Sequence, residues 1–414
     1  MLALDPLLID PIGWEEVGIV SLKVVVAFVL LMITVMFMVW FERKVVSDFQ
    51  NRIGPNLAGP WGILQTLADG IKLFFKEDLI PEKSDRVVFQ LAPYLSLVPA
   101  FLVFVIVPVG GNFNDGNGGR VSWFGHETLV QVADPPIGIL LFLAMSSLAV
   151  YGIMLAGWAS GSKYPLLGSV RASAQMVSYE AALGLSVVAV LLQSGSLSTN
   201  EIVAGQAAEG FAGFIPNWNV IVTGFVPFVI FLIAGTAELN RPPFDLVEAE
   251  QELVGGFHTE YSSIRFALFF LAEFMNTVTM SAIIVTLFFG GPAGPIFFGL
   301  TWLWPTIWFL LKLLVFLFIF VWFRATLPRL RYDQLMDLGW KLLIPVALGW
   351  VLFLAARNVA QDQDWGTGGL AAVIAVTLGA FIVGGALLMG AINTARRERL
   401  ADELGTTEFE GSKS

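Results

Sequence analysis

The chain has 414 residues, of which 56% are hydrophobic and 14% charged, and its formal net charge is −10. A mean hydropathy of +0.76 indicates a polytopic membrane protein rather than a soluble one. The sequence has no cysteine, which excludes disulfides and cysteine-ligated iron–sulfur clusters within the chain. Its two histidines, His126 and His258, lie far apart in sequence and argue against a histidine metal site. The negative charge argues against nucleic-acid binding.

Nine apolar stretches are long enough to cross the hydrocarbon core of a bilayer, which takes about 20 residues. They lie at about 18–41, 87–109, 136–158, 174–194, 220–238, 264–290, 300–325, 339–357 and 370–393. The sequence therefore predicts an all-α polytopic membrane protein with about nine transmembrane helices. No basic residue precedes Lys23, so we expect the first stretch to remain a membrane helix rather than to be cleaved as a signal peptide.

The distribution of positive charge predicts the orientation. If the N-terminus lies outside, the loops and tail on the inner side contain 19 of the 23 Lys and Arg residues. The remaining four are Lys23, Arg120, Lys312 and Arg357. The positive-inside rule favours this arrangement, with charged loops on the inner side.

The first inner loop contains a segment, 64–76, with helical periodicity. Four apolar residues share one side of a helical wheel, and three charged residues share the other. The apolar residues are Leu64, Leu67, Ile71 and Phe75, and the charged ones are Asp69, Lys72 and Lys76. This pattern predicts an amphipathic helix at the membrane surface. A plain interfacial anchor would show the same pattern.

A second inner segment, 238–273, is unusually acidic. It holds seven carboxylates and only two arginines, Arg241 and Arg265. The carboxylates are Glu238, Asp245, Glu248, Glu250, Glu252, Glu260 and Glu273. If the residues after the proline pair 242–243 are helical, Asp245, Glu248 and Glu252 share one face and Glu250 lies on the other side. Like charges on one face raise one another's pKa, which favours proton exchange. The alternative is a solvated acidic loop between two membrane helices.

Three ionisable residues, Glu180, Glu273 and Lys312, lie inside apolar stretches. An ionised side chain in the bilayer costs about 2.5 to 3.5 kcal/mol on insertion scales. A buried structural hydrogen bond could explain any one of them, whereas several together indicate a proton or ion path.

The other loops carry weaker signals. The last inner loop, 324–341, mixes cations with Asp333 and Asp337, a composition that suits docking to a soluble partner. The outer loop, 110–131, is predicted to be flexible and polar. We find no internal repeat and no phosphate loop or dinucleotide fingerprint.

Five motifs give a specific resemblance. They are Glu42-Arg43-Lys44, Arg52-Ile53-Gly54-Pro55-Asn56, Ser178-Tyr179-Glu180, Glu238-Leu239-Asn240-Arg241-Pro242-Pro243-Phe244-Asp245 and Arg331-Tyr332-Asp333-Gln334-Leu335-Met336. Together they closely resemble the H subunit of bacterial NADH:quinone oxidoreductase (respiratory complex I), the counterpart of subunit 1 of mitochondrial complex I. The resemblance covers roughly residues 15–358.

The resemblance implies a role for the inner loops. In this family the subunit joins the membrane arm to the peripheral arm, and its inner loops form much of the tunnel by which quinone leaves the bilayer. By motif, the quinone-binding residues are Glu42, Arg43, Arg52, Asp69, Lys72, Arg241 and Asp245. The implied proton path comprises Glu180, Glu238, Asp245, Glu248, Glu250, Glu252 and Glu273. Quinone would be the substrate, with no metal or cluster in this chain.

The resemblance also implies partners and a location. The partners would be the peripheral-arm quinone-site and iron–sulfur subunits, small membrane subunits and antiporter-like subunits, and the isolated chain should be inactive. The location would be the bacterial cytoplasmic membrane. Family members typically have eight membrane helices, so we divide the chain into a family-like domain, 1–358, and a C-terminal extension, 359–414, with an additional helix and a polar tail. Such extensions bring actinobacterial enzymes to mind, which favours menaquinone over ubiquinone.

Three alternatives remain open at this point. A membrane subunit of a related energy-converting hydrogenase would share the carboxylate path without quinone reduction. A stand-alone proton-coupled transporter should be active as a single purified chain. A purely structural anchor should tolerate replacement of any single carboxylate.

Overall fold

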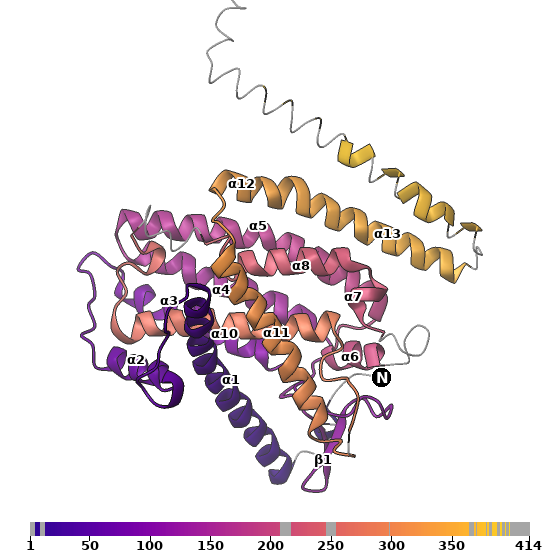
Figure 1. Ribbon diagram of the computed structural model, residues 1–414, viewed down its shortest axis with the longest axis horizontal. Helices are drawn as coiled ribbons and strands as arrows, with labels where there is room; N and C mark the ends of the chain where they lie inside the picture. Colours follow the sequence, from indigo (N-terminus) through magenta and orange to yellow (C-terminus); the bar gives the residue numbers. More distant parts are fainter. Residues whose placement is uncertain are drawn as a thin grey trace, which may run out of the picture.

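The computed structural model describes residues 5–8, 13–207, 217–245, 254–297 and 299–363, together with some residues between 368 and 397. In this part the regular secondary structure is almost entirely helical, and loops join the helices (Figure 1). The helices are η1 (Pro6–Leu8), α1 (Trp14–Phe49), η2 (Pro60–Gly62), α2 (Gln65–Phe74), α3 (Arg86–Phe104), α4 (Gly138–Ala159), α5 (Lys163–Ser194), α6 (Thr199–Ala207), α7 (Asn219–Val222), α8 (Phe225–Glu238), η4 (Gly256–His258), α10 (Ser263–Phe288), α11 (Trp304–Thr326), α12 (Tyr332–Asp337), η5 (Leu338–Leu343) and α13 (Ile344–Asp362). The strands are β1 (Arg120–Trp123) and β2 (His126–Leu129).

Seven helical segments in the described part are long and apolar enough to cross a membrane: α1, α3, α4, α5, α10, α11 and the continuous segment from α12 to α13. α8 is also apolar but has only 14 residues. These eight correspond to eight of the nine predicted spans and confirm an all-α polytopic membrane protein. Part of the ninth span, 370–393, lies outside the described residues, so that span stays a prediction.

The fifth predicted span, 220–238, divides into α7 and α8 at Gly224. This residue has a φ of 78°, in the left-handed region that favours glycine. A Cβ atom built on Gly224 would lie 2.7 Å from the Trp350 ring, so there is no room for a side chain. The membrane helix therefore begins at Phe225, five residues later than predicted.

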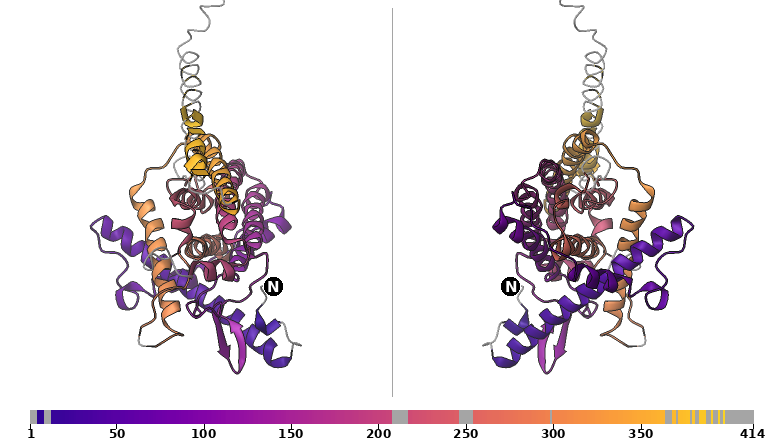
Figure 2. Two further views of the ribbon diagram at one scale, coloured as in Figure 1. Left: turned by 90° about the vertical axis from the view of Figure 1, so that its right-hand side faces the viewer. Right: turned by 90° about the vertical axis from the view of Figure 1, so that its left-hand side faces the viewer.

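α10 is the central helix of the bundle. It packs against α1, α2, α3, α6, α8 and α11, and every side chain from 277 to 288 is buried. A helix buried on all sides is largely apolar all round. The hydroxyl groups of Thr277, Ser281 and Thr286 each donate to the carbonyl four residues back. Figure 2 shows α1 and α11 on the outside of the bundle.

The outer loop 110–131 contains a β-hairpin, which the prediction of a flexible polar loop missed. β1 pairs antiparallel with β2. The hairpin is held by a buried polar cluster in which Lys23 Nζ lies 2.6 Å from Asp5 Oδ2 and also contacts the Thr128 hydroxyl. Lys23 is only 5% exposed, and the carboxylate of Asp5 balances its charge. This pair and the contact with Thr128 fix the hairpin to α1.

Lys312, one of the three ionisable residues predicted inside the membrane, has a structural role. Its Nζ donates hydrogen bonds of 2.8, 2.9 and 2.8 Å to the carbonyls of Phe289, Gly291 and Ala293, and it lies 5.2 Å from the centre of the Trp218 ring. These contacts tie α11 to the loop that follows α10. A buried structural hydrogen bond thus accounts for this residue.

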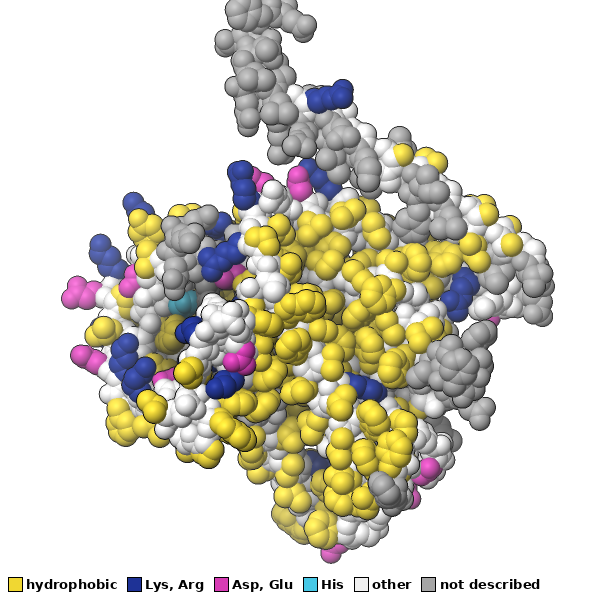
Figure 3. Space-filling model, in the orientation of Figure 1, with side chains coloured by type: hydrophobic (Ala, Val, Ile, Leu, Met, Phe, Trp, Pro, Cys, Tyr) yellow, Lys and Arg dark blue, Asp and Glu magenta, His cyan; other side chains and the backbone are white. Residues whose placement is uncertain are grey.

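Hydrophobic side chains cover a broad face of the molecule, whereas most charged side chains on that face gather at the end that carries α2 and α12 (Figure 3). On α11 the exposed side chains include Leu311, Val315, Phe318 and Trp322. Contiguous apolar exposure of this size is expected of helices in contact with lipid.

Candidate functional site

A partly buried cluster of opposite charges joins three helices and a turn at the charged end of the bundle; Arg241 and Glu42 are buried, whereas Glu273 and Arg324 are more exposed. Arg241, in the turn after α8, places Nη1 3.2 Å from Glu42 Oε2 at the end of α1 and Nη2 3.1 Å from Glu273 Oε1 on α10. Arg324, at the end of α11, pairs with the other oxygen of Glu42. Buried charges are tolerated only when they are paired, so Arg241 (4% exposed) is the bridge that stabilises both carboxylates.

The turn after α8 aims Arg241 into this cluster. The backbone N–H of Arg241 donates to Thr236 O at 3.3 Å, and Phe244 N donates back to Arg241 O at 2.9 Å. The guanidinium also lies over the Phe274 ring, 4.6 Å from its centre, a favourable cation–π arrangement. The side chain is therefore held on three sides before any substrate is present.

Asp245 lies at the end of the same turn, directly after Phe244. It is buried, and Arg329 Nη2 lies 2.9 Å from its Oδ2. The helix predicted after the proline pair falls on residues 246–253, which lie outside the described residues together with Glu248, Glu250 and Glu252. The predicted acidic face therefore stays a prediction.

A second, more exposed group of charges links α1 to α2. Arg43 Nη1 lies 2.6 Å from Asp69 Oδ2, and Lys72 Nζ lies 4.0 Å from Asp69 Oδ1. Partial burial acts to raise the pKa of Asp69, but the hydrogen bond and charge of Arg43 outweigh it and hold that pKa below its usual value. The predicted amphipathic helix thus exists as α2, anchored to α1 through its charged face.

Two pockets adjoin these charges. The arginine pocket, of about 510 Å³, is lined by Glu42, Arg43, Val46, Arg52, Ile53, Gly54, Pro55 and Arg324. The apolar pocket, of about 440 Å³, lies between α1, α2 and α10 and is lined by Val35, Met36, Val39, Arg43, Thr66, Leu67, Asp69, Gly70, Ile71, Leu73, Phe74, Phe75, Ile264, Ala267, Phe270, Leu271 and Phe274. Because Arg43 lines both, the two pockets adjoin each other.

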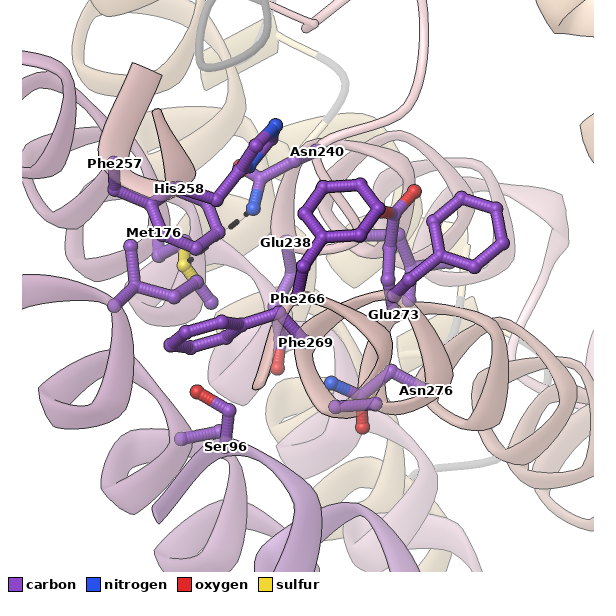
Figure 4. A pocket seen from close by; sticks show the side chains of 15 residues that line it. Ser96, Met176, Glu238, Asn240, Phe257, His258, Phe266, Phe269, Glu273 and Asn276 are labelled. Carbon is purple, nitrogen blue, oxygen red and sulfur yellow. Dashed lines mark hydrogen bonds between the residues drawn. The ribbon is translucent and has the colours of Figure 1, made fainter. Parts of the chain in front are cut away.

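A third, smaller space lies behind Glu273. This inner cavity is enclosed by side chains of α3, α4, α5, α8, α10 and η4, and Figure 4 shows Glu238, Glu273, Asn276 and Ser96 around it. Its volume of about 60 Å³ is enough for a few water molecules. Ser96 Oγ and Glu238 Oε2 are buried and have no hydrogen-bond partner within the described part of the chain. These orphaned polar atoms favour water in the cavity.

Glu180 lies next to this cavity rather than in it. The hydroxyl of Ser147 on α4 donates to Glu180 Oε1, and the adjacent Ser146 lines a small space together with Glu238. Glu180 and Glu238 are close enough to interact electrostatically. The three predicted membrane carboxylates are therefore arranged in the order Glu273, Glu238 and Glu180.

His258, at the rim of the inner cavity, is a polar residue to which the sequence pattern assigns no role. Its imidazole packs edge to face against Phe257 and Phe266, with ring centres 5.0 and 5.4 Å apart. Burial disfavours the charged imidazolium and lowers the pKa of His258 from 6.5 to about 4. The side chain is thus neutral at pH 7.

We predict that His258 makes the assembled enzyme sensitive to acid. Because the pKa is lower in the folded state than in the unfolded one, the unfolded chain binds the proton more tightly. The stability that neutral His258 contributes is fully present above pH 6.5 and is lost as pH falls from 6.5 towards 4. The temperature of heat inactivation should therefore fall less in His258→Gln than in wild type between about pH 7.5 and about pH 5. Equal falls in the two proteins would contradict the assignment.

Comparison with known proteins decides the family. A family model described as NADH dehydrogenase matches residues 22–355. The H subunit of NADH-quinone oxidoreductase from Frankia alni is 50% identical over 400 residues, covering 94% of this chain and 85% of that protein. The chain belongs to the family of NADH-quinone oxidoreductase H subunits. The H subunit from Streptomyces avermitilis is 48% identical over 359 residues (85% and 76% covered), and that from Cutibacterium acnes is 44% identical over 410 residues (96% and 89% covered).

Family membership confirms the resemblance drawn from the five motifs, and the structure shows how those motifs meet. Within the described part, most predicted residues at the charged end form two groups. Glu42 and Glu273 pair with Arg241, and Asp69 lies beside Arg43 and Lys72. Asp245 pairs instead with Arg329. Arg52 lines the arginine pocket.

Two arginines that pair with these residues, Arg324 and Arg329, were predicted only as part of a charged docking loop and not as site residues. The serines Ser96, Ser146 and Ser147 were not predicted either. Their only sequence signal is a hydroxyl inside an apolar stretch, which is common in membrane helices. In the described part, no three His, Asp or Glu side chains are grouped to hold a metal ion.

Proposed function

We propose that this chain is a membrane subunit of a proton-pumping NADH:quinone oxidoreductase, and that its charged end receives quinone and links quinone reduction to proton translocation. The observation that carries the proposal is the bridge from Glu42 through Arg241 to Glu273. It connects the arginine pocket, which Glu42 lines, with the inner cavity, which Glu273 and Glu238 line.

The two outer pockets have the chemistry of the two ends of a quinone. The apolar pocket, between α1, α2 and α10, suits an isoprenoid tail arriving from the bilayer. The arginine pocket beyond it offers the guanidinium groups of Arg43, Arg52 and Arg324, which donate hydrogen bonds to carbonyl or quinolate oxygens. The chain has no cysteine, so the iron–sulfur cluster that supplies the electrons would belong to a partner subunit.

Coupling would begin with a change of charge in the arginine pocket. Two electrons delivered to quinone create negative charge beside Arg324, which also pairs with Glu42. Charges interact strongly in a low-dielectric interior, so a shift of Arg324 towards the reduced quinone alters the balance between Glu42 and Arg241. Arg241 transmits this change to Glu273.

From Glu273 a proton would pass through the water of the inner cavity to Glu238 and then to Glu180. Asp245, Glu248, Glu250 and Glu252 would form the acidic link between the quinone site and this path; the last three lie outside the described residues. Beyond Glu180 we propose that antiporter-like and small membrane subunits receive the signal.

The same proposal assigns the surroundings of the chain. The charged end would face the cytoplasm and bind the peripheral-arm quinone-site and iron–sulfur subunits, with the N-terminus outside and the helices in the bacterial plasma membrane. The clustering of charged groups at one end supports this orientation. Menaquinone stays our predicted substrate, and activity with ubiquinone and menaquinone analogues tests that prediction.

Purification of the native assembly through a tag on this chain tests the overall proposal. We expect NADH:quinone reductase activity to copurify with the chain. Copurification with a hydrogenase would overturn the proposal in favour of an energy-converting hydrogenase subunit. Transport activity of the chain alone in vesicles would overturn it in favour of a stand-alone transporter.

The apolar pocket gives a more specific test. Gly70 on α2 lines this pocket, and a Cβ atom built there meets nothing within 4 Å. Gly70→Leu should therefore fit without strain, and it should support the helix. It should also narrow the pocket, and thus raise the apparent KM for long-tailed quinones more than for short-tailed ones.

Gly18→Leu on α1 is the matched control, because a Cβ at Gly18 also meets nothing within 4 Å and Gly18 lies at the other end of that helix. We expect unchanged KM values in this variant. Equal responses to short and long quinones in Gly70→Leu would show that α2 is only a membrane anchor.

A further inference from the structure

A buried amide, that of Gln175 on α5, lies against the turn that follows α8. The side chain is 1% exposed. Its Nε2 donates hydrogen bonds of 2.8 Å to Ala237 O and 2.8 Å to Phe244 O, and it lies 3.4 Å from Asn240 Oδ1. One side chain thus contacts the residues on both sides of the turn.

The orientation of this amide follows from its surroundings. All three neighbouring atoms are hydrogen-bond acceptors, so the NH₂ end must face the turn. The flipped amide would place its oxygen against two carbonyl oxygens. Ala237 O belongs to the last turn of α8, where carbonyls lack the usual helical partners, and Asn240 N donates to it at 3.3 Å. Gln175 therefore adds a second, shorter hydrogen bond to Ala237 O and joins it to Phe244 O through one side chain.

The segment held in this way, 238–244, contains the residues on which the proposed function depends. Glu238 faces the inner cavity, and Arg241 bridges Glu42 and Glu273. The same segment has further supports: Phe244 packs on Tyr179 with ring centres 5.3 Å apart, and Leu330 N donates to Pro243 O at 3.0 Å.

We propose that Gln175 is a positioning residue of the coupling site. By fixing both sides of the turn 238–244 to α5, it keeps Arg241 in reach of Glu42 and Glu273 while Glu238 faces the inner cavity. This inference rests on the proposed function, because the turn matters only if Arg241 and Glu238 take part in it.

The test compares two buried glutamines. Gln206, 4% exposed at the other end of the bundle, also donates to a carbonyl, Thr286 O at 2.9 Å, and accepts from Asn219 N and Gly290 N at 3.1 and 3.0 Å. Gln206 also donates to Ile202 O at 3.3 Å. Gln206→Leu therefore removes at least as many buried hydrogen bonds as Gln175→Leu but leaves the turn 238–244 intact.

The readouts separate positioning from stability. NADH:ferricyanide activity and the amount of assembled enzyme serve as assembly controls. Because the turn that carries Arg241 loses its hydrogen bonds to α5, we expect Gln175→Leu to reduce quinone kcat/KM by at least about fivefold. Gln206→Leu should keep the wild-type kcat/KM in whatever enzyme assembles. A wild-type kcat/KM in Gln175→Leu, or an equal loss in Gln206→Leu, overturns the inference.

A second variant, Gln175→Glu, adds a pH readout and covers the case in which Gln175→Leu does not assemble. A protonated glutamate can donate to Ala237 O or Phe244 O, whereas an ionised one would repel both carbonyls. The ratio of its quinone activity to that of wild type should therefore fall as pH rises. A ratio that is constant with pH would overturn the inference.

Arg241→Met distinguishes failure of this inference from failure of the proposed function. If Arg241→Met is impaired but the Gln175 variants are normal, the proposed function stands and only the positioning role is wrong. If all of these variants reduce quinone normally, the proposed site itself is wrong.

Discussion

Replacing Arg241 by methionine should abolish most of the NADH:quinone reductase activity of the assembled enzyme and leave its NADH:ferricyanide activity intact. Arg241 is buried and pairs with both Glu42 and Glu273. Methionine keeps much of the apolar volume over Phe274 but leaves two carboxylates without their shared partner. Breaking a buried ion pair on one side costs about 3 to 5 kcal/mol, so we expect quinone kcat/KM to fall by at least about a hundredfold.

Arg265→Met is the matched control for this experiment. Arg265 also pairs with a carboxylate, Asp78, at 3.1 Å, and it lies 5.6 Å from the centre of an aromatic ring, that of Phe89. It is outside the cluster around Arg241, so Arg265→Met should affect stability more than quinone reduction. Equal loss of quinone and ferricyanide activity in Arg241→Met would mean failed assembly, and unchanged quinone activity would refute the site.

Hydropathy predicts the membrane helices of this chain well because burial in lipid demands long apolar runs regardless of tertiary contacts. It predicts their ends less well. α5 begins at Lys163, 11 residues before the predicted span, because its first three turns mix polar and apolar residues. In these turns Gly168 packs closely against Gly256, because a Cβ atom built on Gly168 would lie only 2.8 Å from the Cα atom of Gly256. The helix is stabilised by that packing rather than by lipid.

The site was only partly predictable for a related reason. The hydropathy pattern places Glu42, Arg241 and Glu273 in or near apolar segments. The motifs imply that these three residues act together. The partner of a buried charge depends on which helices pack side by side. Arg324 is 282 positions from Glu42 in the sequence, and no local pattern connects them. The same holds for Gln175, whose two carbonyl partners lie 62 and 69 positions away.

The membrane carboxylates give the second large expected effect: Glu180→Gln and Glu273→Gln should each assemble normally but lose most coupled quinone reduction and proton pumping. Glutamine can still accept the hydrogen bond from Ser147 at position 180, and at position 273 its amide oxygen can stay beside the Arg241 guanidinium. It cannot take up or release a proton. Structural carboxyls should therefore tolerate the change, whereas carboxyls that relay protons should lose at least about tenfold in coupled turnover.

Turnover and proton-to-electron ratio measured in membrane vesicles decide between these roles. Glu→Asp at both positions should keep part of both quantities because the ionisable group survives. Glu201→Gln is the matched control, since Glu201 accepts a hydrogen bond from Ser196 at the other end of the bundle much as Glu180 does from Ser147, and it should behave as wild type. If Glu180→Gln and Glu273→Gln also kept the wild-type turnover and proton-to-electron ratio, Glu273, Glu238 and Glu180 would have a structural role and would not relay protons. The coupling step would then lie in another part of the enzyme.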